Sequence, residues 1–189
     1  MSATRTIVAV AAVVVVAAGV GAFFALRSGG DAVSSGGPLV APKDGYFSAS
    51  IPIDVGKPAS FGLLVVANKQ REPITLERVE LVEPTPGLRL VGSYAQPTGS
   101  GLGVGLLSGF PPSGAGPNRH DVAGYALAHG AEARIVVGVA SARTGSFDAK
   151  ALRLYYRAKG KQYRDDWPFA VRVCSPAKPW AGRCHAPTG

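Results

Sequence analysis

The sequence contains few of the residues that build metal centres and disulfide frameworks. Among 189 residues there are two cysteines, three histidines and one methionine, and aromatic residues make up 8%. Two cysteines exclude a disulfide-dense miniprotein and a four-cysteine zinc module. The 25 Gly and 15 Pro are too few for a collagen-like or disordered chain and too many for a helical bundle. The length predicts one folded domain that can bury a core.

Charged and polar side chains are missing from one long segment near the N-terminus. Residues 1–6 carry Arg5 and the α-amino group, and residues 7–26 then form an uninterrupted apolar run. A helix of that length is about 30 Å long, matches the hydrocarbon core of a bilayer and has no polar face. The run predicts a single-pass transmembrane signal-anchor helix, with residues 1–6 cytoplasmic and the following chain extracytoplasmic. The alternative is a signal peptide cleaved near Ala22, which leaves a secreted protein.

A flexible tether is expected between this segment and the folded part. Residues 27–45 are rich in Gly, Ser and Pro and contain few apolar side chains. A spacer is useful when one of its ends is attached to the membrane. The tether therefore favours an uncleaved anchor at residues 7–26 in the lipid bilayer.

Residues 46–174 show a hydrophobic period of two, which is typical of β-strands. No stretch after residue 40 has amphipathic helical spacing for more than two turns. About seven short strands separated by turn residues predict an all-β, immunoglobulin-like β-sandwich. The expected strands are Tyr46–Val55, Ser60–Asn68, Ile74–Val82, Leu88–Tyr94, Ala131–Ala140, Ala149–Arg157 and Gln162–Cys174.

Three local features refine this prediction. The alternation slips near Glu77–Arg78, which indicates a β-bulge. Lys159-Gly160 predicts a tight hairpin turn. Residues 95–130 are rich in Gly, Pro and Ser and form a long loop, a candidate binding loop. The Gly-x-Gly-x-Gly run at residues 101–105 lacks the following helix that a phosphate-binding loop needs, so nucleotide binding is not expected.

Two runs of the sequence carry a resemblance to a known group. They read SFGLLVVANKQREPITLERVELVEPTPGLRLVG and, later, AHGAEARIVVGVASARTGSFDAKALRLYYRAKGKQYRDDWPFAVRVC. This pattern, an apolar strand ending in Asn, a Pro turn and a late Tyr-rich strand pair ending in Cys, resembles the small immunoglobulin-like ectodomains of membrane-anchored, mostly uncharacterised actinobacterial proteins. The resemblance implies an architecture and brings no catalytic residues. The second strand lacks the cysteine of an antibody-type domain.

The two cysteines lie close together in the sequence. In an exported domain Cys174 and Cys184 predict a disulfide that staples the tail, residues 175–189, to the last strand. The alternative is an exported metal-binding domain in which Cys174, Cys184 and His185 hold copper or zinc. That set is one ligand short, and nothing in the sequence places His120 or His129 beside it. No cofactor is expected.

Catalytic signatures are weak. His120-Asp121 beside Arg119 could form a base and its orienting carboxylate, but neither Ser108 nor Ser113 lies in a Gly-x-Ser-x-Gly elbow. Asp165-Asp166 offers too few oxygen ligands for calcium. We therefore assign no catalytic residue and expect a non-catalytic protein, with an enzyme whose site lies in the 95–130 loop as a lesser alternative.

Positive charge concentrates at the C-terminal end of the sequence. Residues 38–149 hold nine basic and nine acidic side chains, whereas residues 150–189 hold nine basic and two acidic ones. A solvated outer strand face explains alternating charge by itself. The functional interpretation is a docking surface for an anionic envelope polymer, anionic lipid headgroups or an acidic protein. Because the domain is expected to be exported, nucleic acid is not expected as a partner. We name these residues the basic-aromatic patch: Lys150, Arg153, Tyr155, Arg157, Lys159, Lys161, Tyr163, Arg164 and Arg172.

Overall fold

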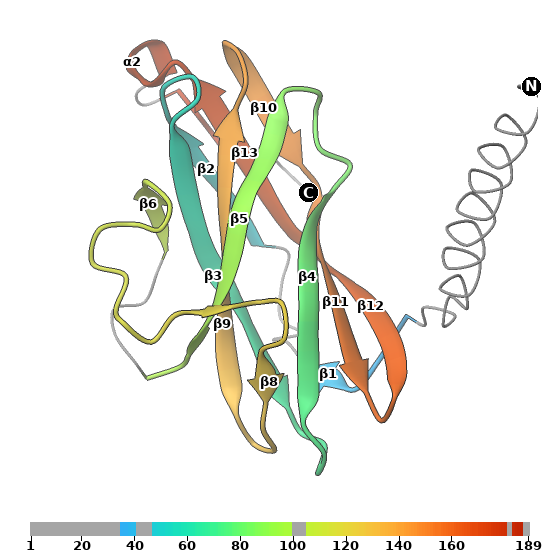
Figure 1. Cartoon of the computed structure of the whole chain (residues 1–189). Helices are drawn as coiled ribbons and strands as arrows, with labels where there is room; N and C mark the ends of the chain where they lie inside the picture. The colour runs from blue at the N-terminus through green and yellow to red at the C-terminus, as the bar shows by residue number, and fades with distance from the viewer. Residues whose placement is uncertain (1–34, 41–46, 100–104, 181–182, 187–189) are drawn as a thin grey trace, which may run out of the picture. The chain divides into compact units, whose positions relative to one another are not determined.

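Antiparallel β-strands account for most of residues 35–40, 47–99, 105–180 and 183–186, which are the residues that the computed structural model describes (Figure 1). The all-β prediction is confirmed. The chain divides into residues 1–33 and a compact unit from Ser34 to Gly189. The predicted span at residues 7–26 and its n-region lie outside the described residues. Within the described ranges, no helix is long and apolar enough to cross a bilayer.

The first layer is a six-stranded sheet centred on two long strands, β3 (Pro58–Asn68) and β9 (Glu132–Ser141). On one side of β9 lies β5 (Leu88–Pro97), followed by the short edge strand β7 (His120–Asp121). The other edge of β3 is covered by two short strands, β1 (Leu39–Val40) at its end and β6 (Leu106–Ser108) at its start.

The second layer comprises a four-stranded sheet and a three-stranded sheet, which share one long hairpin that bends in the middle. Its arms are β10 (Gly145–Ala149) continued by β11 (Ala151–Ala158), and β12 (Lys161–Trp167) continued by β13 (Phe169–Ser175). The register between the arms changes by one residue between the Leu152–Trp167 and Ala149–Val171 pairs. Pro168 lies at this change, and a proline has no N–H to donate to the strand ladder. The predicted strand Gln162–Cys174 is therefore divided in two.

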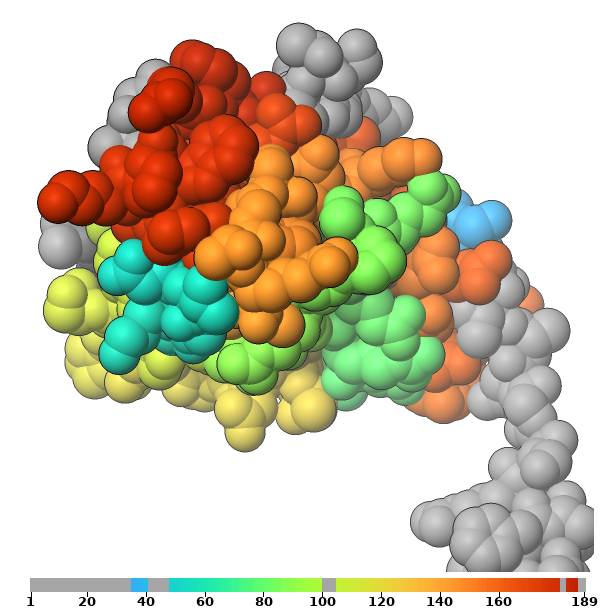
Figure 2. Space-filling view, turned by 90° about the horizontal axis from the view of Figure 1, so that it is seen from above, coloured from blue at the N-terminus to red at the C-terminus, as the bar shows by residue number. Residues whose placement is uncertain are grey.

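Three more strands complete this layer at opposite ends of the hairpin. The strand β4 (Ile74–Val82) pairs with β11, and the short β8 (Ala126–Leu127) pairs with β4. At the other end β2 (Phe47–Pro52) runs parallel to β13. A short helix, α2 (Ala177–Trp180), follows β13. Figure 2 shows this end of the domain, where the C-terminal residues in red lie beside the β2–β3 turn in cyan, and Ala177 N–H donates to Asp54 Oδ1 (3.2 Å).

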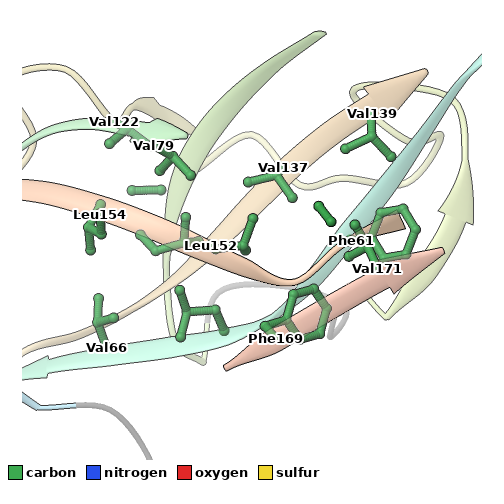
Figure 3. Packing of buried hydrophobic residues seen from close by; sticks show 14 of the residues in the cluster. Phe61, Val66, Val79, Val122, Val137, Val139, Leu152, Leu154, Phe169 and Val171 are labelled. Carbon is green, nitrogen blue, oxygen red and sulfur yellow. The ribbon is translucent and has the colours of Figure 1, made fainter. Parts of the chain in front are cut away.

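The core lies between the two layers and uses the faces that the alternation predicts. Phe61 and Val66 come from β3 and Val137 from β9, and they pack with Leu152 and Leu154 of β11 in one buried cluster (Figure 3). The rings of Phe61 and Phe169 meet edge to face, with centroids 6.3 Å apart. Burial of these side chains drives the two layers together.

Two predicted local features are confirmed. Lys159 and Gly160 both have positive φ, 51° and 74°, as a two-residue type I′ hairpin turn requires. Tyr155 pairs with Arg78 and Tyr156 with Leu76, so Glu77 is the extra residue of a bulge.

Other boundaries differ from the prediction. Leu39–Val40, which the sequence assigns to the tether, pair with the end of β3, and Gly36 N–H donates to Asp165 Oδ1 (2.8 Å). A Cβ on Gly37 would lie 2.2 Å from the Tyr156 hydroxyl, so this segment packs closely against the domain. The glycines of this segment suggested a flexible tether, because glycine has few conformational restrictions. The same lack of a side chain also lets the backbone pack closely against the domain.

Candidate functional site

The basic-aromatic patch lies on the hairpin arms, and most of its cations have acidic partners. Arg153 Nε and Nη2 donate to the two carboxylate oxygens of Asp166 on the neighbouring strand β12, at 2.6 and 2.8 Å. This bidentate pair holds the pKa of Asp166 below its usual value. Arg172 forms the same kind of pair with Asp148 on β10, at 2.7 and 2.8 Å.

The other acidic partners come from β4 and its flanking turns, far away in the sequence. Arg157 Nε lies 3.3 Å from Glu77 Oε1, and Lys159 Nζ lies 3.6 Å from Glu72 Oε2. Lys150 pairs with Glu83. The sequence places four glutamates in residues 72–83 and the cations after residue 149, and antiparallel pairing of β4 with β11 brings them together. The cations lie on the hairpin, and most of them alternate with carboxylates in a ladder of opposite charges.

The two tyrosines of the patch lie on different faces. Tyr155 is 7% exposed, because the Arg78 guanidinium covers its ring at 3.5 Å from the centroid, and its hydroxyl donates to Glu80 (3.1 Å). Tyr163 occupies the inner face of β12 and stacks on Tyr156, with centroids 5.6 Å apart. The two tyrosines therefore do not form one continuous aromatic surface.

Positive charge remains in excess at one end of the domain. Within the described residues, Lys161 and Arg164 of β12 and Arg71 of the β3–β4 turn form no ion pair. The β3–β4 turn and the β11–β12 turn lie at the same end, because the start of β4 pairs with the end of β11. Two paired lysines lie beside them, and we name the five residues the basic end: Lys69, Arg71, Lys159, Lys161 and Arg164.

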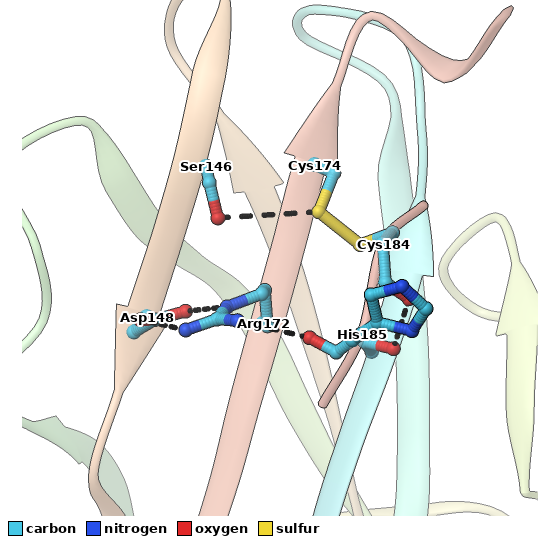
Figure 4. The surroundings of a disulfide bond; sticks show 7 residues. Ser146, Asp148, Arg172, Cys174, Cys184 and His185 are labelled. Atoms are coloured by element: carbon cyan, nitrogen blue, oxygen red, sulfur yellow. Dashed lines mark hydrogen bonds and ion pairs between the residues drawn. A yellow bond between two sulfur atoms is a disulfide. The ribbon is translucent and has the colours of Figure 1, made fainter. Parts of the chain in front are cut away.

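The predicted disulfide joins Cys174 to Cys184, with Cα atoms 5.9 Å apart (Figure 4). Ser50 on the adjacent β2 donates to the Cys184 carbonyl (2.8 Å), and Arg172 Nη1 donates to the His185 carbonyl (3.0 Å). Arg172 therefore ties the tail to the sheet. It stands at the other end of the hairpin from the basic end.

The alternative metal site needs two thiolates. In the structure the sulfur atoms of Cys174 and Cys184 are bonded to each other, and a disulfide sulfur is not a thiolate ligand. The described residues contain no group of three or more His, Cys, Asp or Glu side chains in a metal-binding arrangement. The geometry does not favour this alternative.

The described part of the long loop packs on the outer face of the first sheet. Gly92 of β5 and Gly138 of β9 are paired across the strands. A Cβ on Gly138 would lie 2.3 Å from Phe110 Cγ, and one on Gly92 would lie 2.8 Å from the same ring. The glycine pair thus makes a slot for the Phe110 ring, which also contacts Tyr94 and Val136 in a second small core.

A pocket of about 210 Å³ opens beside this small core. Tyr94 is 5% exposed, and its buried hydroxyl has no hydrogen-bond partner among the described residues. Burial raises the pKa of Tyr94, and the charges of Arg119 and Arg134 act in the opposite direction. The pocket lining comes from β5, the loop after β6 and β7, and comprises Ser93, Tyr94, Phe110, Pro111, Arg119, His120 and Asp121.

The other loop residues that the sequence singled out lie at different places in the structure. The His120 ring stacks on Tyr125, with centroids 5.2 Å apart, and His120-Asp121 form an edge strand. Ser108 lines a different cavity, next to Asp54 and Lys57. Residues 101–104 of the glycine run lie outside the described residues. Sequence reasoning missed Ser93 and Tyr94 as pocket residues. The slot could have been predicted from the isolated glycines within two strands. Such glycines often mark a place where another part of the chain packs closely against the backbone.

Comparisons with known proteins give distant similarities alone. No family model and no curated protein matches the chain. The VesB protease of Vibrio cholerae has a TM-score of 0.37 and 11% identity over 72% of this chain and 32% of that chain. The human CEP192 PapD-like domain 7 has a TM-score of 0.38 and 10% identity over 73% and 84%. A family 123 glycoside hydrolase from Clostridium perfringens has a TM-score of 0.39 and 9% identity over 69% and 23%. This chain spans about a third of the length of VesB.

Proposed function

We propose that this chain is a membrane-anchored, extracytoplasmic docking module without catalytic activity, whose basic end contacts an anionic component of the cell envelope. The uncharged run at residues 7–26 and the basic n-region support the anchor and its orientation. The disulfide supports an oxidising compartment, because such bonds are rare in the cytoplasm.

The finer fold assignment belongs to the same proposal. An immunoglobulin-like sandwich is supported by two layers of β-strands packed around one core. The proposed relationship to actinobacterial ectodomains rests on the sequence pattern alone. Domains of this architecture serve many functions, so the role is argued from the surface.

The observation that carries the proposal is the difference between the cations of the basic end and those of the ladder. The ladder cations Lys150, Arg153, Arg157 and Arg172 have carboxylate partners within the domain. Arg71, Lys161 and Arg164 form no such pairs within the described residues and are exposed. The electric field of an unpaired exposed cation is not cancelled by a neighbouring carboxylate, so it can attract an external anion. Several such cations together attract a polyanion at low ionic strength.

The test uses full-length protein in nanodiscs of neutral lipid and retention on two immobilised anionic materials, purified cell-wall polymer and beads coated with anionic lipid. Changing Arg71, Lys161 and Arg164 to Glu should abolish retention at low salt, and added salt should weaken retention of the unchanged protein. The matched control changes three other exposed cations without ion pairs in the described residues, Lys57, Arg89 and Lys178, to Glu. Equal retention of both triple variants contradicts the proposal, because net charge rather than the basic end would then decide binding.

A further inference from the structure

The pocket beside β7 holds polar groups that the docking proposal does not use. Arg119 forms no ion pair among the described residues, although it lines the pocket next to Asp121. Ser93 and Tyr94 belong to the same lining, and the hydroxyl of Tyr94 is buried. A buried phenol without a partner is unusual, because buried polar groups in folded proteins are nearly always hydrogen-bonded.

The charges around the pocket favour an anion. The guanidinium groups of Arg119 and Arg134 are both close enough to Tyr94 to act on its ionisation. Asp121 is the carboxylate in the pocket lining, and it can accept a hydrogen bond from a donor group of a ligand. Phe110 and Pro111 form an apolar wall. This combination of a planar cation, a serine, one acceptor and an apolar wall matches a small molecule that carries both an oxyanion and donor groups.

We propose that this pocket binds a carboxylate that stands next to a hydroxyl or ammonium group, with Arg119 on the carboxylate and Asp121 on the neighbouring donor. The volume of about 210 Å³ admits a single small unit, such as a sugar acid or an amino acid at a chain end. The loop supplies its own wall, since Phe110 is seated in the Gly92–Gly138 slot before any ligand arrives. A preformed wall lowers the ordering entropy lost on binding.

The site is separate from the basic end, so the two proposals can fail independently. The lining residues come from β5, β7 and the loop after β6. The cations of the basic end come from the β3–β4 turn, the β11–β12 turn and β12. Charge reversal at the basic end is therefore expected to leave ligand binding in the pocket unchanged.

The experiment titrates full-length, isotope-labelled protein in detergent with four probes and follows the NMR signals of the His120 and Tyr94 rings. D-glucuronate and L-alanine carry the proposed chemistry from its two sources, while D-glucose and acetate each lack one half of it. We expect saturable shifts with one or both of the first two, at a Kd of about 1 mM, and weaker or no shifts with the others.

Variants separate a binding role from a structural one. Arg119→Gln should weaken binding at least about tenfold. Tyr94→Phe removes a buried hydroxyl and should leave binding unchanged while the ring packing persists. Arg89→Gln, on the same strand as Tyr94 but outside the pocket lining, is the matched control and should bind normally. Because Arg119 is exposed, its substitution leaves folding intact, and this variant decides the outcome if Tyr94→Phe unfolds. Absence of saturable shifts with every probe, or unchanged binding by Arg119→Gln, overturns the proposal.

Discussion

Replacing Gly138 by Ala should change stability in opposite directions depending on the residue at position 110. In the unchanged protein the new methyl carbon would lie 2.3 Å from Phe110 Cγ, closer than any real carbon contact, so the ring must leave its slot. Overpacking of this kind costs about 1–3 kcal/mol. Phe110→Ala alone removes a partly buried ring and should cost roughly 2 kcal/mol.

In the Phe110→Ala background the obstacle is gone. Ala is then better than Gly within a strand by about 0.5–1 kcal/mol, since glycine loses more conformational entropy on folding. Gly138→Ala should therefore destabilise the wild type and stabilise the Phe110→Ala variant. Gly138 is not among the residues with positive φ, so the backbone accepts alanine.

The measurement is urea unfolding of the full-length protein followed by tryptophan fluorescence, in all four members of the double-mutant cycle. Gly105→Ala serves as the control, because a Cβ there meets nothing within 4 Å. Its effect should be small and independent of Phe110. If Gly138→Ala lowers stability equally in both backgrounds, the reasoning that the glycine pair exists to seat the ring is refuted.

Three further results are expected. Replacing Cys174 and Cys184 by Ala should lower the unfolding free energy by about 2.7 kcal/mol, from the entropy of a loop of roughly ten residues, and calorimetry that finds no loss contradicts this. Arg153→Ala should lower the unfolding free energy slightly at neutral pH, as for other exposed ion pairs. Because the pKa of Asp166 is lowered from 3.8, that contribution is present above pH 3.8 and is lost as the pH falls below it, so acid titration should erase the difference between the variant and wild type. Burial and the hydrogen bond to Asp165 raise the pKa of Tyr156 from 10.0, so the stabilising effect of the neutral phenol is present below pH 10 and is lost at higher pH. Tyr156→Phe should therefore flatten the dependence of stability on alkaline pH. An unchanged dependence would contradict this role of Tyr156.

Local patterns were sufficient for much of the fold. Strand alternation predicted the inward faces of β9 and β11, because neighbouring side chains in a strand point to opposite sides whatever the partner strand is. The turn at Lys159-Gly160 and the bulge at Glu77 were also predictable, since each is encoded by two or three adjacent residues. The division of the predicted strand Gln162–Cys174 at Pro168 was missed. Apolar residues alternate in the same phase before and after Pro168, and only the pairing register with the other hairpin arm changes there.

The candidate sites show the limit of local reasoning. Net charge along the sequence indicated a basic hairpin, whereas Arg157 and Glu77, 80 residues apart, form a pair because β4 lies beside β11. The same holds for the 95–130 loop. Composition indicated a long loop, and it did not reveal that the Gly92–Gly138 slot seats Phe110. Pairings of this kind depend on which strands become neighbours.

The sequence by itself determined the all-β class, the approximate strand positions and the cysteine pair, because each follows from local periodicity or from there being two cysteines to join. The tertiary structure alone decided which cations remain unpaired, where the loop packs and that Tyr94, Arg119 and Asp121 share a pocket. The physical reason is distance: electrostatic and packing energies act over a few ångströms, and separation along the chain does not reveal which residues the sheet topology brings within that range.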